Sequence, residues 1–337
     1  MTDVLNALVT LANFVIVPAA AYGSQLALGA LGVTLVYGVL RFTNIAHGDQ
    51  MAFGTMVTIF GVWGLQGAGI SIAPLPTALL ALPLGIVATG ALLYGTDRLV
   101  YRFYRRQKAA PVIFMIVSIG VMFVMNGLVR IIIGVEDIRF DDGARFLISA
   151  RDFREMTGLR EGLAIKSSQV VTVVTAALSV ALLFWFLTHT RTGKSMRAFS
   201  DNEDLALLSG INPERVVAVT WLIVAALTTV AGVLYGLDKS FNPFTYFHIL
   251  LPIFAAAIVG GLGNPLGAIA GGFVIAFSEI SLTYAFKRVL GYLLPDDWAP
   301  AGLAQILSTD YKFAVSFFLL VVVLLIRPTG LFRGKAL

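Results

Sequence analysis

The chain consists mainly of long apolar runs separated by short polar segments. A helical run of about 20 residues is long enough to cross the hydrocarbon core of a membrane. Composition agrees, because 58% of the 337 residues are hydrophobic and 13% are charged, whereas soluble domains are about 25% charged. Too few polar residues remain to cover a water-facing surface, so a soluble fold is excluded. We expect an all-α protein that crosses the membrane several times.

Ten runs qualify as candidate membrane spans, and together they predict one transmembrane domain over residues 1–337 with eight to ten crossings. The second, third and eighth runs have only about 15 residues. They are therefore expected to be short crossings or broken helices that meet inside the membrane. The ten runs are Leu5 to Tyr22, Gln25 to Leu40, Met51 to Leu65, Thr77 to Gly95, Val112 to Ile133, Gln169 to Thr188, Val216 to Leu237, His248 to Leu262, Leu266 to Phe286 and Phe313 to Ile326.

Clusters of Lys and Arg indicate the orientation, since cytoplasmic loops carry an excess of these residues. The segment Arg98 to Lys108 and the stretch just after the sixth run are strongly basic, so both are expected in the cytoplasm. The stretch 134–168 lies between them with one run on each side, which places it outside as a periplasmic loop. The tail Arg327 to Lys335 is then cytoplasmic, and if all ten runs cross, so is the N-terminus.

Several kinds of chemistry have no support in the sequence. The chain has no cysteine, and its histidines His47, His189 and His248 are far apart, so neither a disulfide framework nor a metal or other cofactor is expected. Thr188 to Ser195 ends in Gly-Lys-Ser like a phosphate-binding loop, but its first residue is not the required glycine. No nucleophile is paired with a base inside a run, so an enzyme is not expected. The net charge of +5 fits cytoplasmic loops better than nucleic-acid binding.

The polar decapeptide Arg41 to Gln50 separates the second and third runs. It is either an ordinary loop or a helix break inside the membrane, where free backbone must be buried in protein or line a cavity. Because the flanking runs are too short for two comfortable crossings, we predict a break beside a translocation path. The candidate path residues in it are Asn44, His47, Gly48 and Asp49.

A second set of candidate path residues lies on the fifth run. Four residues spaced four, four and three apart share one helical face, and Arg130 lies beside it. They are Ser118, Met122, Asn126 and Val129. Ser118 and Asn126 are expected either to line a path without a tight binding pocket or to make hydrogen bonds between helices.

Two features of the last runs bear on packing and ion coupling. Gly263, Gly267 and Gly271 recur every four residues, which predicts a helix face that packs closely against a partner helix. Glu279 is the clearest carboxylate inside a run. Ion-driven carriers usually need chains of such groups, so a single glutamate argues only weakly for ion coupling.

The segment Ser195 to Ser209 predicts one short surface helix with apolar residues and with acidic residues such as Asp201 and Glu203. Gly210, followed by Asn212-Pro213, supplies its C-terminal stop. This helix either lies in the membrane interface or docks a soluble partner in the cytoplasm.

Four sequence blocks follow one another along most of the chain: Ala27 to Gly38 with Asn44 to Asp49, Arg191 to Asn212, Gly260 to Ala268, and Arg327 to Phe332. In this order they resemble the integral membrane permeases of branched-chain amino-acid ABC importers, of the H-type subunit. The chain departs from that family in three ways. Ile45 and Asp49 replace the commoner Phe and Glu, the leader before Gly23 is long, and the insertion Tyr284 to Ala304 is large.

The resemblance implies a permease subunit without enzymatic activity, in a bacterial cytoplasmic membrane and in contact with its lipid. It implies three kinds of protein partner: a second, homologous permease forming a heterodimer, two cytoplasmic ATPase subunits that hydrolyse ATP, and a periplasmic or lipid-anchored solute-binding protein. It also implies that 189–215 is the cytoplasmic coupling segment. The coupling residues would be Arg191, Gly193, Arg197, Glu203, Asp204, Leu205, Ala206 and Gly210.

The substrate implied by the resemblance is a branched-chain or similar small amino acid. The family also contains permeases for urea and short-chain amides, so these remain alternatives. From a different class of protein, the alternative is an ion-coupled secondary amino-acid carrier that works alone. Such a carrier should show ligands for its coupling ion inside the spans, whereas a permease should show a cytoplasmic docking helix.

Overall fold

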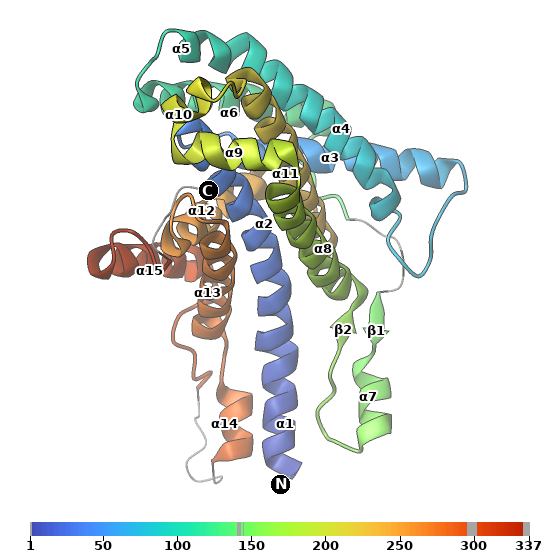
Figure 1. Ribbon diagram of the computed structural model, residues 1–337. Coiled ribbons are helices and arrows are strands. Elements are labelled where there is room, and N and C mark those ends of the chain that lie inside the picture. The colour runs from blue at the N-terminus through green and yellow to red at the C-terminus, as the bar shows by residue number, and fades with distance from the viewer. Residues whose placement is uncertain (1, 140–142, 144, 295–301, 333–337) are drawn as a thin grey trace.

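The computed structural model describes residues 2–139, 143, 145–294 and 302–332 (Figure 1). Helices dominate, and the strands β1 (Phe146–Ile148) and β2 (Ile165–Lys166) form one small antiparallel sheet. Eight helical stretches in this part of the chain are long and apolar enough to cross a membrane. This confirms the expectation of an all-α protein that crosses the membrane several times.

The first long helix runs without a gap from Thr2 to Leu40. It comprises α1 (Thr2–Leu11), the π-helical turn η1 (Ala12–Ile16) and α2 (Val17–Leu40). Pro18 is the second residue of α2, just beyond the π turn, and proline disturbs the preceding turn of a helix because it lacks an N–H and its ring is bulky. The first two candidate runs are therefore one helix, which lowers the number of separate runs within the predicted range of eight to ten crossings.

The other helices account for the remaining runs. They are α3 (His47–Gly67), α4 (Ala78–Thr96), η2 (Asp97–Tyr101), α5 (Arg102–Arg106), α6 (Pro111–Ile133), α7 (Ala150–Thr157), α8 (Ser167–His189), α9 (Arg191–Asp201), α10 (Glu203–Leu208), α11 (Pro213–Asp238), α12 (Pro243–Gly260), α13 (Pro265–Thr283), α14 (Lys287–Leu293), η4 (Thr309–Tyr311) and α15 (Lys312–Ile326). The runs that looked short belong to longer helices, since α3 includes a polar first turn and α12 begins at Pro243. Residues 295–301 of the Tyr284 to Ala304 insertion lie outside the described part.

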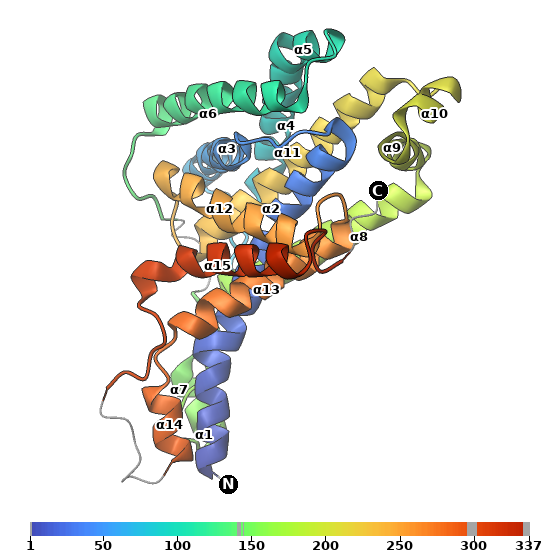
Figure 2. The same ribbon diagram turned by 90° about the vertical axis from the view of Figure 1, so that its left-hand side faces the viewer.

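Helix α2 is the centre of the bundle, with α11, α12, α13 and α8 packed around it (Figure 2). Nearly every residue from Ala19 to Val39 is buried, as expected for a helix that is apolar on all sides. Glycines let neighbours come close: a Cβ on Gly29 would lie 2.6 Å from the side chain of Ile253, and one on Gly23 would lie 2.6 Å from Phe273. The core therefore depends on small residues along α2.

The N-terminus lies at the same end of the molecule as the 134–168 loop. In Figure 1, α1, α7 and α14 project together at one end, whereas α5, α9 and α10 lie at the other. The backbone N–H of Glu161 donates to the Asn6 side chain at 3.1 Å, and that of Ala164 donates to Asn13 at 3.0 Å. The N-terminus therefore cannot be cytoplasmic if the 134–168 loop is periplasmic. The expected cytoplasmic N-terminus and the expected periplasmic 134–168 loop therefore exclude each other, and both sides of the membrane stay predictions.

The C-terminal end lies with the basic clusters, as expected. Pro328 and Thr329 line a cavity together with Tyr37 and Arg41 from the end of α2. Arg41 in turn contacts α9. Arg333 and Lys335 of the tail lie outside the described residues.

Candidate translocation site and cytoplasmic segment

The segment between α2 and α3 turns back into the helix bundle. Arg41 adopts a left-handed backbone conformation (φ 58°) that ends α2, and α3 begins at His47. The ring of His47 lies against Gly32 of α2, where an added Cβ would be 2.6 Å from its Cε1. Since Gly32 is two helical turns before the end of α2, the segment is a buried break and not a surface loop. The sequence argument for a break was that the flanking runs are too short to cross the membrane. That argument is wrong, because α2 has 24 residues and α3 has 21.

Most side chains of the break segment are buried, and several of them hold the segment itself. Asn44 donates from Nδ2 to Oε1 of Gln50 at 3.0 Å, and its Oδ1 accepts from the backbone N–H of Ala46 at 3.2 Å. A Cβ on Gly48 would lie 2.5 Å from the carbonyl oxygen of Tyr246, so glycine allows α3 to contact α12 here. His47 is fully buried, and neither ring nitrogen has a hydrogen-bond partner among the described residues.

The two sets of candidate path residues meet in the structure. The backbone N–H of Ile45 donates to the Ser118 hydroxyl at 3.0 Å, and Asn126 donates from Nδ2 to Oδ1 of Asp49 at 2.7 Å. The expected face of α6 therefore packs along the break between α2 and α3. The first bond joins the break segment to α6, and the second joins α6 to α3, which is the interhelical role that the sequence left open.

Two charged side chains beside this contact each have one polar atom without a hydrogen-bond partner among the described residues. Asp49 is buried, yet its Oδ2 has no partner in the described part of the chain, and the same holds for Nε of Arg130. The guanidinium of Arg130 lies over the ring of Phe244 in α12, 3.8 Å from its centroid. Sequence reasoning missed Phe244, because it comes from a distant segment and no local pattern marks it.

The carboxylate of Glu279 in α13 is compensated by α15. The Ser316 hydroxyl donates to Glu279, and Nζ of Lys312 lies 3.7 Å from its Oε2. Lys312 also lies over the ring of Tyr22 in α2, 4.0 Å from its centroid. Within the described residues, no three His, Cys, Asp or Glu side chains gather as a group that could hold a metal ion. Glu279 thus tethers α15 to the bundle.

The cytoplasmic segment consists of two helices, so the expectation of a single helix from Ser195 to Ser209 is wrong. Helix α9 begins early, because the Thr190 side chain caps it by accepting from the N–H of Gly193 at 3.0 Å. The chain then breaks at Asn202, whose side chain accepts from the N–H of Leu205 at 3.0 Å and so starts α10. Asparagine followed by acidic residues is a strong helix start, and it overrides a continuous helix here.

Some of the predicted coupling residues are buried against the rest of the molecule, and most of the others are exposed to solvent. A Cβ on Gly193 would collide with the carbonyl oxygen of Phe186, so this glycine lets α9 lie against α8. Ala206 is buried and Arg197 is half-buried, whereas the other predicted coupling residues are exposed. Leu208, which was not among the predicted residues, is the most exposed leucine of α10 at 85%. The exposed members are Arg191, Glu203, Asp204, Leu205 and Gly210.

Helix α9 is tied directly to the end of α2. The guanidinium of Arg41 donates to the carbonyl of Ser200, and the Ser200 hydroxyl donates to the carbonyl of Gly38 at 2.7 Å. Arg41 is only three residues before Asn44. These two hydrogen bonds therefore tie α9 to the start of the buried break.

A cavity of about 520 Å³ opens between α10, α11 and the α5–α6 turn. Its wall carries basic and acidic groups, including Arg106, Lys108 and Glu203. Phe42 also lines it and packs against Tyr101 at a ring-centroid distance of 5.2 Å. The Tyr101 hydroxyl donates to Oδ1 of Asn44 at 3.5 Å, so an aromatic cluster connects the cavity wall to Asn44. The cluster comprises Phe42, Tyr101, Phe114 and Trp221.

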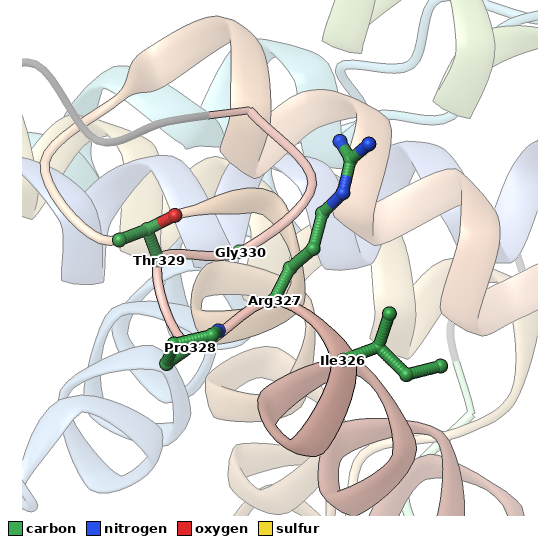
Figure 3. Close-up of a pocket in the computed structure, with 5 residues that line it drawn as sticks. All are labelled: Ile326, Arg327, Pro328, Thr329 and Gly330. Carbon is green, nitrogen blue, oxygen red and sulfur yellow. The ribbon is translucent and has the colours of Figure 1, made fainter.

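Of the three glycines predicted to form one packing face, Gly267 and Gly271 do so, whereas Gly263 does not. Gly267 and Gly271 of α13 lie against the carbonyl oxygens of Gly260 and Ala256 in α12. Gly263 differs from expectation, since it lies in the turn before α13 with φ 83°. The C-terminal block Arg327 to Phe332 packs against the end of α12, where the N–H of Leu331 donates to the carbonyl of Val259 at 2.8 Å. Figure 3 shows the adjoining turn, Ile326 to Gly330, which lines a pocket of about 290 Å³.

Comparison with known proteins gives the family. A sequence profile described as branched-chain amino acid transport system / permease component matches residues 15–324. The chain belongs to this permease family. Three of the four sequence blocks noted above lie inside the matched range, and the block Arg327 to Phe332 follows it directly.

Individual relatives agree over nearly the full length. The permease is 32% identical over 316 residues to the high-affinity branched-chain amino acid transport system permease protein LivH of Escherichia coli (strain K12), covering 92% of this chain and 91% of that protein. It is 32% identical to LivH of Salmonella typhimurium over 313 residues, with the same coverage. It is 30% identical to BraD of Pseudomonas aeruginosa over 310 residues, covering 92% of each chain. It is thus a polytopic membrane permease.

Proposed function

We propose that this permease is one membrane subunit of an ATP-driven importer for branched-chain or similar small amino acids in a bacterial inner membrane. Its relatives LivH and BraD are described as high-affinity branched-chain amino acid transport permeases. A second, homologous permease completes the path, two ATPase subunits dock from the cytoplasm, and a solute-binding protein delivers the amino acid from outside. The permease subunit itself does no chemistry.

The cytoplasmic segment is the observation that carries the proposal. Helix α10 projects from the body and exposes Leu205 (60%) and Leu208 (85%) beside the acidic side chains of Glu203 and Asp204. An apolar face flanked by charges suits a groove on a soluble partner. The basic segments at the same end favour the cytoplasmic side for this helix, where ATP is available.

The buried hydrogen bonds from α9 give this docking helix a mechanical role. Movement of an ATPase lobe displaces α10 and α9, and the Ser200 contacts pass the displacement to Gly38 and Arg41 at the end of α2. The break that follows Arg41 carries the candidate path residues. ATP binding and hydrolysis thereby alter the packing of the break against α6.

The test is a double substitution on α10, Glu203→Lys with Ala206→Asp. It reverses an exposed charge and places a carboxylate at a buried position, so we expect ATPase docking to be lost and ATP-driven uptake to fall at least tenfold. Glu155→Lys, on α7 at the opposite end, is the matched control and should transport normally. The docking role is wrong if the double variant keeps both its uptake and the co-purification of the ATPase.

The pairing of Glu279 supports an ATP-driven mechanism over an ion-coupled one. A coupling carboxylate must bind and release its ion during each cycle. Glu279 is instead buried between Lys312 and Ser316, where its negative charge is already compensated. Glu279 therefore does not support the alternative of an ion-coupled carrier.

A further inference from the structure

Two opposite charges with free atoms lie on adjoining helices beside the break. Asp49 uses Oδ1 for the bond from Asn126, while its Oδ2 has no partner among the described residues. Arg130 lies one helical turn beyond Asn126 on α6 and forms no ion pair within the described part of the chain. A buried carboxylate oxygen without a partner is costly, so its retention calls for an explanation.

An apolar cluster adjoins these charges. Ala46, Met122 and Met125 form a hydrophobic cluster separate from the main core, with Phe53 among the residues packed against it. Met122 is one turn before Asn126 on α6, and Phe53 is one turn after Asp49 on α3. Methionine side chains adapt to ligands of different shape, because they are flexible and unbranched. The cluster thus offers an adaptable apolar surface next to a carboxylate and a guanidinium.

Of the helices around Asp49 and the methionine cluster, α6 is the one that is least firmly packed against the bundle. Its contacts with the bundle are mainly with α3, with smaller ones to α12 and η2. Its outer face exposes large apolar side chains, including Phe123 (68%) and Ile131 (87%). A shift of α6 away from α3 breaks few contacts and uncovers Asp49, Arg130 and the methionine cluster together.

We infer that Asp49 and Arg130 are the groups that contact the ammonium and the carboxylate of an amino acid as it passes between α3 and α6. The Met122–Met125 cluster contacts its apolar side chain. The inference rests on the proposed importer function and assigns the recognition to particular residues. A zwitterion with an apolar side chain matches all three features, whereas urea or a sugar matches neither charge.

The test uses the complete importer, reconstituted in vesicles with its ATPase subunits, partner permease and solute-binding protein. Asp49→Asn and Arg130→Gln each remove one charge, and a charged hydrogen bond lost from a buried site costs about tenfold to a hundredfold. We expect L-leucine uptake per ATP hydrolysed to fall at least tenfold in each variant. Stimulation of ATP hydrolysis by the solute-binding protein should remain within twofold, since α9 and α10 are untouched.

The matched control removes a buried anion and a cation elsewhere. Glu279→Gln with Lys312→Met does this on the α13–α15 side of α2 and should leave uptake per ATP unchanged. The inference is overturned if Asp49→Asn and Arg130→Gln also keep uptake per ATP within twofold. Absence of ATP-driven leucine uptake by the wild-type complex would instead overturn the importer function itself.

A second measurement keeps the charged residues intact and so does not depend on whether those variants assemble. Val129→Cys introduces the sole cysteine of this chain, on the α6 face next to Arg130, and its reaction with N-ethylmaleimide is followed in the assembled complex. L-leucine should slow the reaction at least threefold. The same concentration of 4-methylpentanoate, which lacks the ammonium, or 3-methylbutylamine, which lacks the carboxylate, should not. Equal protection by all three compounds, or by none, contradicts the assignment.

Discussion

At the scale of single residues, buried charges of this permease differ in how completely they are paired. The Asp97 carboxylate accepts two bonds from Arg105, at 2.9 and 3.0 Å, and a third from the Trp221 indole at 2.9 Å. Glu279 is compensated by Lys312 and Ser316. Asp49 alone among these three keeps an oxygen with neither a hydrogen bond nor an ion pair in the described part of the chain. Paired charges hold helices together, whereas the incompletely paired one is the group that we propose contacts a solute.

The pairing of Glu279 predicts a stability effect. Lys312→Met leaves the carboxylate buried without its cation, which should lower the free energy of unfolding by about 3 kcal/mol. Adding Glu279→Gln removes the stranded charge, so the double variant should regain most of that loss. Unfolding of the purified permease by heat or denaturant measures both. Equal destabilisation of the single and double variants would show that the ion pair is not what matters.

At the scale of elements, the helices follow from apolar periodicity, but their ends do not. The boundary expected near Gly23 disappears because polar residues there are satisfied inside the bundle: Ser24 donates to the carbonyl of Ala20, and Gln25 donates to that of Leu234. The break after Arg41 and the face of α6 were each predicted from the sequence. Their meeting through Asn126 and Asp49 was not, because it depends on packing between segments 77 residues apart.

Close packing of α12 against α13 predicts a sharp difference between two glycines. A Cβ on Gly271 would collide with the backbone carbonyl of Ala256, which cannot move without separating the helices. Gly271→Ala should therefore destabilise the purified permease by about 1–3 kcal/mol. Gly95→Ala is the control, since a Cβ there meets nothing within 4 Å, and helix propensity alone predicts a gain of up to about 1 kcal/mol. Equal unfolding midpoints for the two variants would refute the packing argument.

At the scale of the whole molecule, the two ends of the bundle carry different structures. One end bears α1, α14 and the 134–168 loop with α7, and Glu161 of this loop joins them through its ion pair with Arg288 at 2.8 Å and its backbone hydrogen bond to Asn6. The other bears α5, α9, α10 and the turn after α15 (Figure 1). Charge bias predicted which loops share an end of the bundle, but the end at which the N-terminus lies required knowing that residues 2–40 form a single helix.

This arrangement predicts the accessibility of three positions in intact cells. The chain has no cysteine of its own, so Asp3→Cys, Glu155→Cys and Glu203→Cys each introduce a unique label site. A membrane-impermeant maleimide applied from outside should label the first two, and should label the third only after the cells are permeabilised. Labelling of Asp3→Cys from the same side as Glu203→Cys would contradict the fold.

The central claim is that ATP hydrolysis on separate subunits drives amino-acid uptake through this permease. The most direct measurement is uptake of radiolabelled L-leucine into vesicles that contain the permease with its partner permease and ATPase subunits. We predict that uptake requires both internal ATP and the external solute-binding protein, and that dissipating proton and sodium gradients leaves it unchanged. Uptake driven by an ion gradient in vesicles that contain this chain alone would contradict the account.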